Sequence, residues 1–117
     1  MLLRKDVENM GRPIKFRAWH KYANYMCKNA NTDFLDRDYL EFLQYTELDD
    51  INGDNIYEGD IVWQKSVEKD SSYTNFTGEV KFYNGSWWID NNKNAIPLFN
   101  ESCENQIIGN KFEGLNN

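Results

Sequence analysis

The sequence has one histidine and two cysteines, and no run of 18 apolar residues. Without such a run, no segment is expected to cross a membrane as a helix. No positively charged stretch followed by an apolar run opens the chain, so we expect no secretory signal and interpret Cys27 and Cys103 as reduced thiols. His20 has no partners at metal-ligand spacing. These absences predict a cytoplasmic protein with no membrane contact, no metal, no cofactor and no evident small-molecule substrate.

Aromatic residues, in contrast, are abundant. The chain has 117 residues and a mass of 13.9 kDa, and seven Phe, seven Tyr and four Trp make up 15% of it. Disordered chains have few aromatics, so this composition excludes disorder as the general state. A chain of this length can bury a hydrophobic core without disulfides or metals. We therefore expect one folded domain.

The charges are segregated along the chain, although the net charge is only −6. Residues 1–28 carry seven basic and two acidic side chains, whereas residues 33–60 carry ten acidic side chains and one basic. One interpretation is that the two segments pack together and screen each other. The other is that the acidic stretch is displayed, where it would repel nucleic acid or recruit a basic partner. The pI of about 4.7 disfavours general affinity for DNA.

Alternation of apolar and polar residues predicts a mainly β protein. Residues 14–19 alternate at period two, and residues 25–27 would return as the second strand of an N-terminal hairpin. Asn52-Gly53 and Asn84-Gly85 are typical of type I′ hairpin turns, and Gly59-Asp60 of a further turn. The other predicted strands are 43–48, 55–57, 61–65, 78–83, 86–90, 95–99 and 106–108. Such short strands indicate a small SH3-like or partly open β-barrel.

One short helix is also expected. Helical spacing, at i, i+4, i+7 and i+8, is found for Leu35, Tyr39, Phe42 and Leu43, with Thr32 or Asp33 as the cap. We predict that this helix ends near residue 41 and that a strand follows. The polar, Ser-rich residues 66–77 predict a long loop or an extended hairpin tip.

The order of several sequence blocks resembles the YopX family of phage and prophage proteins. The blocks are IKFRAW (14–19), LQYT (43–46), DING (50–53), IYEGDIV (56–62), GEVKF (78–82), WWI (87–89) and IIGNKFE (107–113). The resemblance implies a small, mostly β protein in a bacterial host cell and implies no biochemical activity. The family usually has Gly at the position of Glu47 and an acidic residue at the position of His20.

The resemblance and the strand pattern together set the expected domain limits. Residues 1–11 are predicted to be a flexible N-terminal arm. A single YopX-like β domain is expected over residues 12–113, and a C-terminal tail over residues 114–117.

The aromatic residues around the Asn84-Gly85 turn are the first candidate binding site. Tyr83, Trp87 and Trp88 flank the turn, and Lys81 lies two residues before Tyr83. Trp87 and Trp88 must point to opposite faces of a hairpin, so one can be exposed. An exposed Trp beside Lys could anchor a protein partner or stack on a base. The alternative is that both indoles are covered by the fold or by a subunit contact.

The basic N-terminal strand is the second candidate site. Lys15 and Arg17, with Arg12 and Lys21, could bind phosphates. No pair of carboxylates or Cys–His arrangement has the signature of a catalytic site, so we predict no enzyme and no catalytic residues. The expected function is a non-catalytic phage or prophage accessory protein that binds a protein partner, either a second copy or a host factor. The alternative is a small β-barrel that binds nucleic acid through its basic strand and exposed aromatics.

Overall fold

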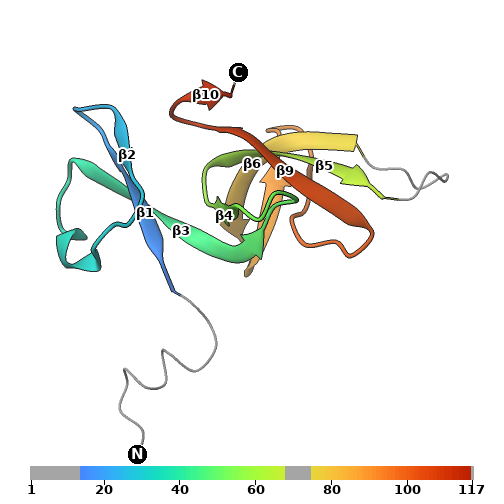
Figure 1. Ribbon diagram of the computed structural model, residues 1–117, viewed down its shortest axis with the longest axis horizontal. Helices are drawn as coiled ribbons and strands as arrows, with labels where there is room; N and C mark the ends of the chain where they lie inside the picture. Colours follow the sequence, from blue (N-terminus) through green and yellow to red (C-terminus); the bar gives the residue numbers. More distant parts are fainter. Residues whose placement is uncertain (1–13, 68–74, 117) are drawn as a thin grey trace, which may run out of the picture.

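The computed structural model describes residues 14–67 and 75–116. These ranges form two antiparallel sheets with almost no helix (Figure 1). The elements are β1 (Phe16–His20), β2 (Tyr25–Cys27), the 3-10 helix η1 (Thr32–Phe34), β3 (Leu40–Asp49), β4 (Asn55–Tyr57), β5 (Asp60–Ser66), β6 (Asn75–Tyr83), β7 (Ser86–Asp90), β8 (Ala95–Pro97), β9 (Cys103–Asn110) and β10 (Gly114–Leu115). One sheet has the order β2-β1-β3-β4 and the other the order β10-β9-β5-β6-β7-β8. The larger sheet curls into a partly open barrel, which confirms the predicted fold class.

Strand β3 connects the two sheets (Figure 1). Its first half pairs with β1, from Leu40 opposite His20 to Gln44 opposite Phe16. Its second half pairs with β4, where Tyr45 lies opposite Tyr57. Leu48, near the end of the strand, packs against the core of the larger sheet. A single long strand therefore belongs to the small sheet at one end and covers the barrel at the other.

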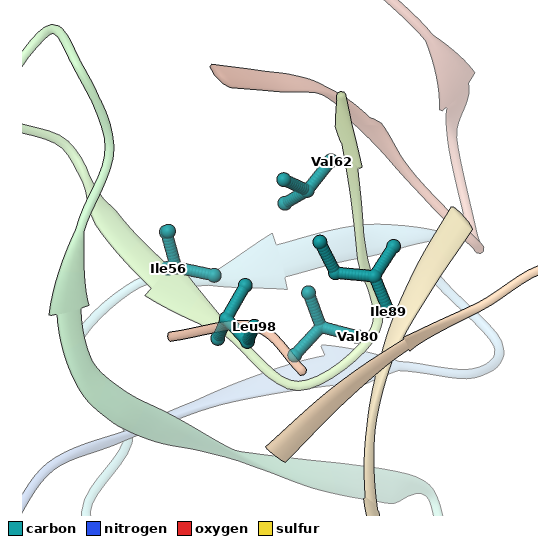
Figure 2. Close-up of a cluster of buried hydrophobic side chains, with 5 residues drawn as sticks. All are labelled: Ile56, Val62, Val80, Ile89 and Leu98. Atoms are coloured by element: carbon teal, nitrogen blue, oxygen red, sulfur yellow. The ribbon is translucent and has the colours of Figure 1, made fainter. Parts of the chain in front are cut away.

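The hydrophobic core lies inside the curled sheet (Figure 2). It consists of fully buried aliphatic side chains from β4, β5, β6, β7 and the segment after β8: Ile56, Val62, Val80, Ile89 and Leu98. Burial of such side chains contributes about 1.5–3 kcal/mol each. Because these residues come from five segments spread over residues 56–98, the barrel forms only when all of these segments assemble.

The two Asn-Gly turns differ in conformation. At Asn84-Gly85 both residues have positive φ, 52° and 76°, as the predicted type I′ turn requires. At Asn52-Gly53 the predicted turn type is wrong, because only Gly53 has positive φ (83°). There the N–H of Gly53 donates to the carbonyl of Asp50, so the turn starts at Asp50, one residue earlier than a type I′ turn centred on Asn52-Gly53 would. The hairpin itself is present, with β3 and β4 as its strands.

The predicted helix to residue 41 is wrong beyond its first turn. The structure has a single 3-10 turn at Thr32–Phe34, and β3 already begins at Leu40. Phe42 and its neighbours pair with β1 instead, so pairing with a distant strand overrides the local helical spacing. Gly114 and Leu115, in the predicted tail, pair with β9 as strand β10. The predicted arm, residues 1–11, lies outside the described residues.

Glu47 adopts a backbone conformation that favours glycine, with φ of 72°. It lies where the pairing of β3 and β4 shifts register between Tyr45 and Asp49. We expect Glu47→Gly to raise the free energy of unfolding by up to about 1 kcal/mol. A left-handed backbone costs a residue other than Gly about 1–2 kcal/mol, and Gly avoids this cost. Part of the gain is offset because Gly has more conformational entropy to lose on folding. Urea denaturation measures the change. Glu47→Ala is the control: it removes the carboxylate but keeps a Cβ, so a gain equal to that of Gly would contradict the backbone explanation.

Candidate protein-binding surface

The β6–β7 hairpin places aromatic side chains on both of its faces. Lys81 lies opposite Trp88, and Phe82 lies opposite Trp87. Side chains alternate along a strand, so the two Trp residues point to opposite faces, as predicted. We call Phe82, Tyr83, Trp87 and Trp88, around the Asn84-Gly85 turn, the hairpin tip.

The outer face of the hairpin carries Tyr83 and Trp88 stacked on each other. Their ring centroids are 5.6 Å apart and their planes differ by 17°. The Tyr83 hydroxyl donates to Asp90 Oδ2 at 3.1 Å, and the Lys81 ammonium lies 3.7 Å from Asp90 Oδ1. Partial burial and the Asp90 carboxylate raise the pKa of Tyr83, while the pKa of Asp90 is lowered chiefly by the N–H of Asn92. This face therefore presents a pre-ordered aromatic pair whose neighbouring lysine is already paired with a carboxylate.

The other face carries Phe82 and Trp87. Their rings meet edge to face, with centroids 5.0 Å apart. Trp87 packs partly against the core, but Phe82 is 53% exposed. Both line a groove of about 420 Å³ between the hairpin and β3, with Tyr45 and Glu47 on the β3 side. An exposed Phe beside a half-buried Trp and an open groove is an arrangement suited to receiving an apolar side chain of a partner.

Arg17 of β1 and Lys15, which directly precedes β1, are not part of the hairpin tip, and neither lines its groove. The Lys15 ammonium lies 4.7 Å from the centre of the Tyr45 ring, and the Arg17 guanidinium 4.8 Å from that of Tyr57. Burial and a hydrogen bond to Asp49 raise the pKa of Tyr45 to about 12. The predicted basic face of β1 is thus packed on the aromatic residues of β3 and β4.

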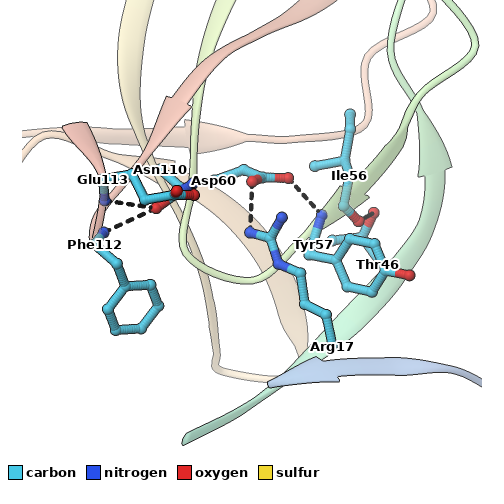
Figure 3. A network of polar contacts seen from close by, with 8 residues as sticks. All are labelled: Arg17, Thr46, Ile56, Tyr57, Asp60, Asn110, Phe112 and Glu113. Carbon is cyan, nitrogen blue, oxygen red and sulfur yellow. Dashed lines mark hydrogen bonds and ion pairs between the residues drawn. The ribbon is translucent and has the colours of Figure 1, made fainter. Parts of the chain in front are cut away.

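Arg17 also forms an ion pair that joins the two sheets (Figure 3). Its Nη2 lies 2.6 Å from Oδ1 of Asp60, and the exposed fractions of the two side chains are 13% and 2%. Asp60 Oδ2 accepts the N–H of Tyr57 at 2.8 Å, across the turn that contains Gly59. Burial raises the pKa of Asp60, and the Arg17 charge opposes that rise. The charge of Arg17 is therefore paired with a carboxylate of the same chain.

Several carboxylates of the acidic stretch also have partners within the chain. Asp50 accepts the N–H groups of Asn52, Asp54 and Ile107 at 2.9, 2.9 and 3.0 Å. Glu41 pairs with Lys111 at 2.8 Å. Of these contacts, Arg17–Asp60 is of the kind expected if the basic segment and the acidic stretch pack together, whereas Asp36, Asp38 and Asp54 are exposed.

The remaining chemistry-bearing residues form no cluster. Cys27 and Cys103 are both free thiols. His20 stacks on Tyr25 and lies tilted against Tyr39, and its Nδ1 accepts the N–H of Ala23. Among residues 14–67 and 75–116, no three His, Cys, Asp or Glu side chains are placed to hold a metal ion. The same described ranges contain no helix long and apolar enough to span a membrane.

Sequence reasoning did not single out Phe82, although a signal for it exists. Once Asn84-Gly85 is taken as a two-residue turn, Tyr83 must lie opposite Ser86 and Phe82 opposite Trp87. Ile51 and Phe99 were also missed, and both are large, exposed apolar residues. From the sequence, Ile51 was considered only as part of the turn motif at 50–53, and Phe99 only as the last residue of the predicted strand 95–99.

The fold and the surface define a small protein of two antiparallel sheets with an aromatic hairpin tip. The family model described as YopX protein matches residues 31–114, and the chain belongs to the YopX family. The crystal structure of protein EF1440 from Enterococcus faecalis has a similar fold, with a TM-score of 0.60 and 20% sequence identity, over 87% of this chain and 95% of that one. No curated protein matches the sequence.

Proposed function

We propose that this YopX-family chain is a non-catalytic accessory protein of a phage or prophage that acts in the bacterial cytoplasm by binding a protein partner at the hairpin tip. The observation that carries the proposal is the exposed Phe82 ring, held edge to face against the half-buried Trp87 beside the groove. Trp and Tyr are enriched among residues that dominate binding energy, and a pre-ordered aromatic cluster loses little entropy on binding. The partner is a second copy of the chain or a host protein.

Nucleic-acid binding is the alternative function, and the charges give it less support. Arg17 and Lys81 are each paired with a carboxylate, and Lys15 lies over the ring of Tyr45. Lys21, in the β1–β2 turn, and Lys28, directly after β2, are exposed, but the net charge of −6 opposes binding to phosphates.

The variant Phe82→Ser tests the proposal. We expect it to fold like the parent and to lose the partner, with at least about tenfold weaker retention, because it removes the apolar anchor at the groove. The measurement is capture of proteins from host lysate by the tagged full chain, with and without nuclease, together with sedimentation velocity of the chain alone for self-association.

Tyr22→Ser is the matched control, because Tyr22 is an exposed aromatic on the β1–β2 turn, outside the hairpin tip. It should retain the partner fully. Equal capture by all three proteins would remove the hairpin tip from the proposal. Capture that disappears with nuclease would favour the nucleic-acid alternative.

A further inference from the structure

A second groove lies on a different part of the barrel, between the β3–β4 turn and the β8–β9 loop. Its volume is about 310 Å³. Two large apolar side chains line it and remain exposed: Ile51, at 53%, and Phe99, at 63%. Ile51 lies in a tight turn, where polar residues, Gly and Pro are usual. We call this hollow the acidic groove, for the charges described below.

The walls of the acidic groove are fixed by hydrogen bonds. The N–H of Ile51 donates to the carbonyl of Asn105 at 2.8 Å, which joins the turn to β9. On the other side, the carbonyl of Leu98 accepts the buried Gln64 amide and the Asn105 amide, both at 3.0 Å. Leu98 is fully buried, so Phe99 next to it is held on a rigid support. A hollow formed in advance loses little conformational entropy when a ligand binds.

The charge of the acidic groove has one sign. The residues that line it include Asp49, Asp50, Glu101 and Glu104, and no Lys or Arg. Asp50 is engaged with backbone N–H groups and Asp49 with the Tyr45 hydroxyl, so Glu101 and Glu104 are the carboxylates placed to meet a ligand. Within the described chain these side chains do not converge as metal ligands would. An apolar hollow with negative edges matches an apolar group that has a cation beside it.

We propose that the acidic groove binds a segment of a partner protein in which a large apolar side chain stands next to Lys or Arg. The apolar side chain fits between Ile51 and Phe99, and the cation meets Glu101 or Glu104. This interaction is independent of the hairpin tip, because none of the residues that line one groove lines the other.

Selection of random dodecapeptides displayed on phage, with the full chain immobilised, tests the proposal. We expect enrichment of peptides that contain Leu, Ile or Phe beside Lys or Arg. The best peptide, synthesised with a fluorescent label, is then titrated by anisotropy. Phe99→Ser and the double variant Glu101→Lys/Glu104→Lys should each weaken its binding by at least about tenfold. The effect of the double variant should shrink at high salt.

Two controls match these variants. Tyr22→Ser removes an exposed aromatic elsewhere, and Asp36→Lys/Asp38→Lys makes the same change of net charge on the exposed loop after η1. Both should leave the affinity within about twofold. No enrichment, enrichment of peptides without a cation, or full binding by Phe99→Ser would overturn the proposal. Self-association of the parent chain that Phe99→Ser abolishes would also overturn it, since the occupant would then be a second copy. Phe82→Ser should also leave the affinity for this peptide unchanged, because Phe82 does not line the acidic groove; loss of the peptide in this variant would place it at the hairpin tip and overturn the proposal.

Discussion

Replacement of Arg17 by Met is expected to lower the free energy of unfolding by about 3–5 kcal/mol at pH 7. Asp60 is almost fully buried, and its carboxylate has the Arg17 guanidinium as its cation at 2.6 Å. Met preserves the apolar stem that lies over the Tyr57 ring but leaves a buried negative charge without its counter-ion. Urea denaturation of the two proteins at pH 7 measures the loss.

The stability lost in Arg17→Met should depend on pH, and the pKa of Asp60 determines whether the loss grows or shrinks as the pH falls. Burial already raises the pKa of Asp60, and the charge and hydrogen bond of Arg17 hold it down, so Arg17→Met raises this pKa further. A carboxyl with a raised pKa in the folded state favours folding below its unfolded pKa, and this contribution is lost as the pH rises through the folded pKa. The deficit of Arg17→Met relative to the parent should therefore shrink as the pH falls from 7 toward 4. A deficit that is constant over this range would contradict the ion-pair explanation.

Two further variants separate the ion pair from simple packing. Asp60→Asn, added to Arg17→Met, removes the unpaired charge while keeping an acceptor for the N–H of Tyr57. It should recover much of the stability at pH 7 and abolish the pH dependence. Lys111→Met breaks the half-exposed pair with Glu41 and should cost at most about 1 kcal/mol. A similar loss in Lys111→Met and Arg17→Met would show that burial does not set the cost.

Much of the strand pattern could be predicted from the sequence because it is local. Strands β2, β4 and β7 have the predicted bounds, and the type I′ turn at Asn84-Gly85 fixes the register of β6 and β7. The helix was predicted wrongly as far as residue 41 because the local spacing fits a helix, whereas from Leu40 onward the chain pairs with β1, about 20 residues or more earlier in the sequence. Local spacing carries no information about such a partner.

The role of Arg17 shows the limit of a period-two pattern. Alternation in residues 14–19 tells which side chains share a face, but not whether that face meets water or a second sheet. Here the face with Arg17 and Trp19 meets the barrel: Arg17 pairs with Asp60, and Trp19 stacks on Phe112 at 4.8 Å. Asp60 follows Arg17 by 43 residues, and Phe112 lies still later in the chain, so only the assembled fold shows that this basic strand makes internal contacts.

At Glu47, in contrast, the sequence did point to an unusual position, because the chain departs there from the family pattern. The resemblance to the YopX family sets Gly at this place, and the backbone of Glu47 has the positive φ that Gly adopts at least cost. The sequence therefore indicated an unusual backbone conformation at residue 47, but not that its φ is positive. The candidate surfaces were predicted less well, because exposure of Phe82 and Phe99 depends on what the rest of the barrel leaves uncovered.

Truncation of Ile89 is expected to cost more stability than truncation of the larger Trp88 beside it. Ile89 is fully buried in the core, so Ile89→Ala leaves a cavity and should lower the free energy of unfolding by about 2–5 kcal/mol. Trp88 stands on the outer face and contacts chiefly Tyr83, so Trp88→Ala should cost about 1–2 kcal/mol. Urea denaturation of both variants gives the order. An equal or larger loss in Trp88→Ala would mean that the outer face is a covered part of the core, and that Tyr83 and Trp88 are not available to a partner.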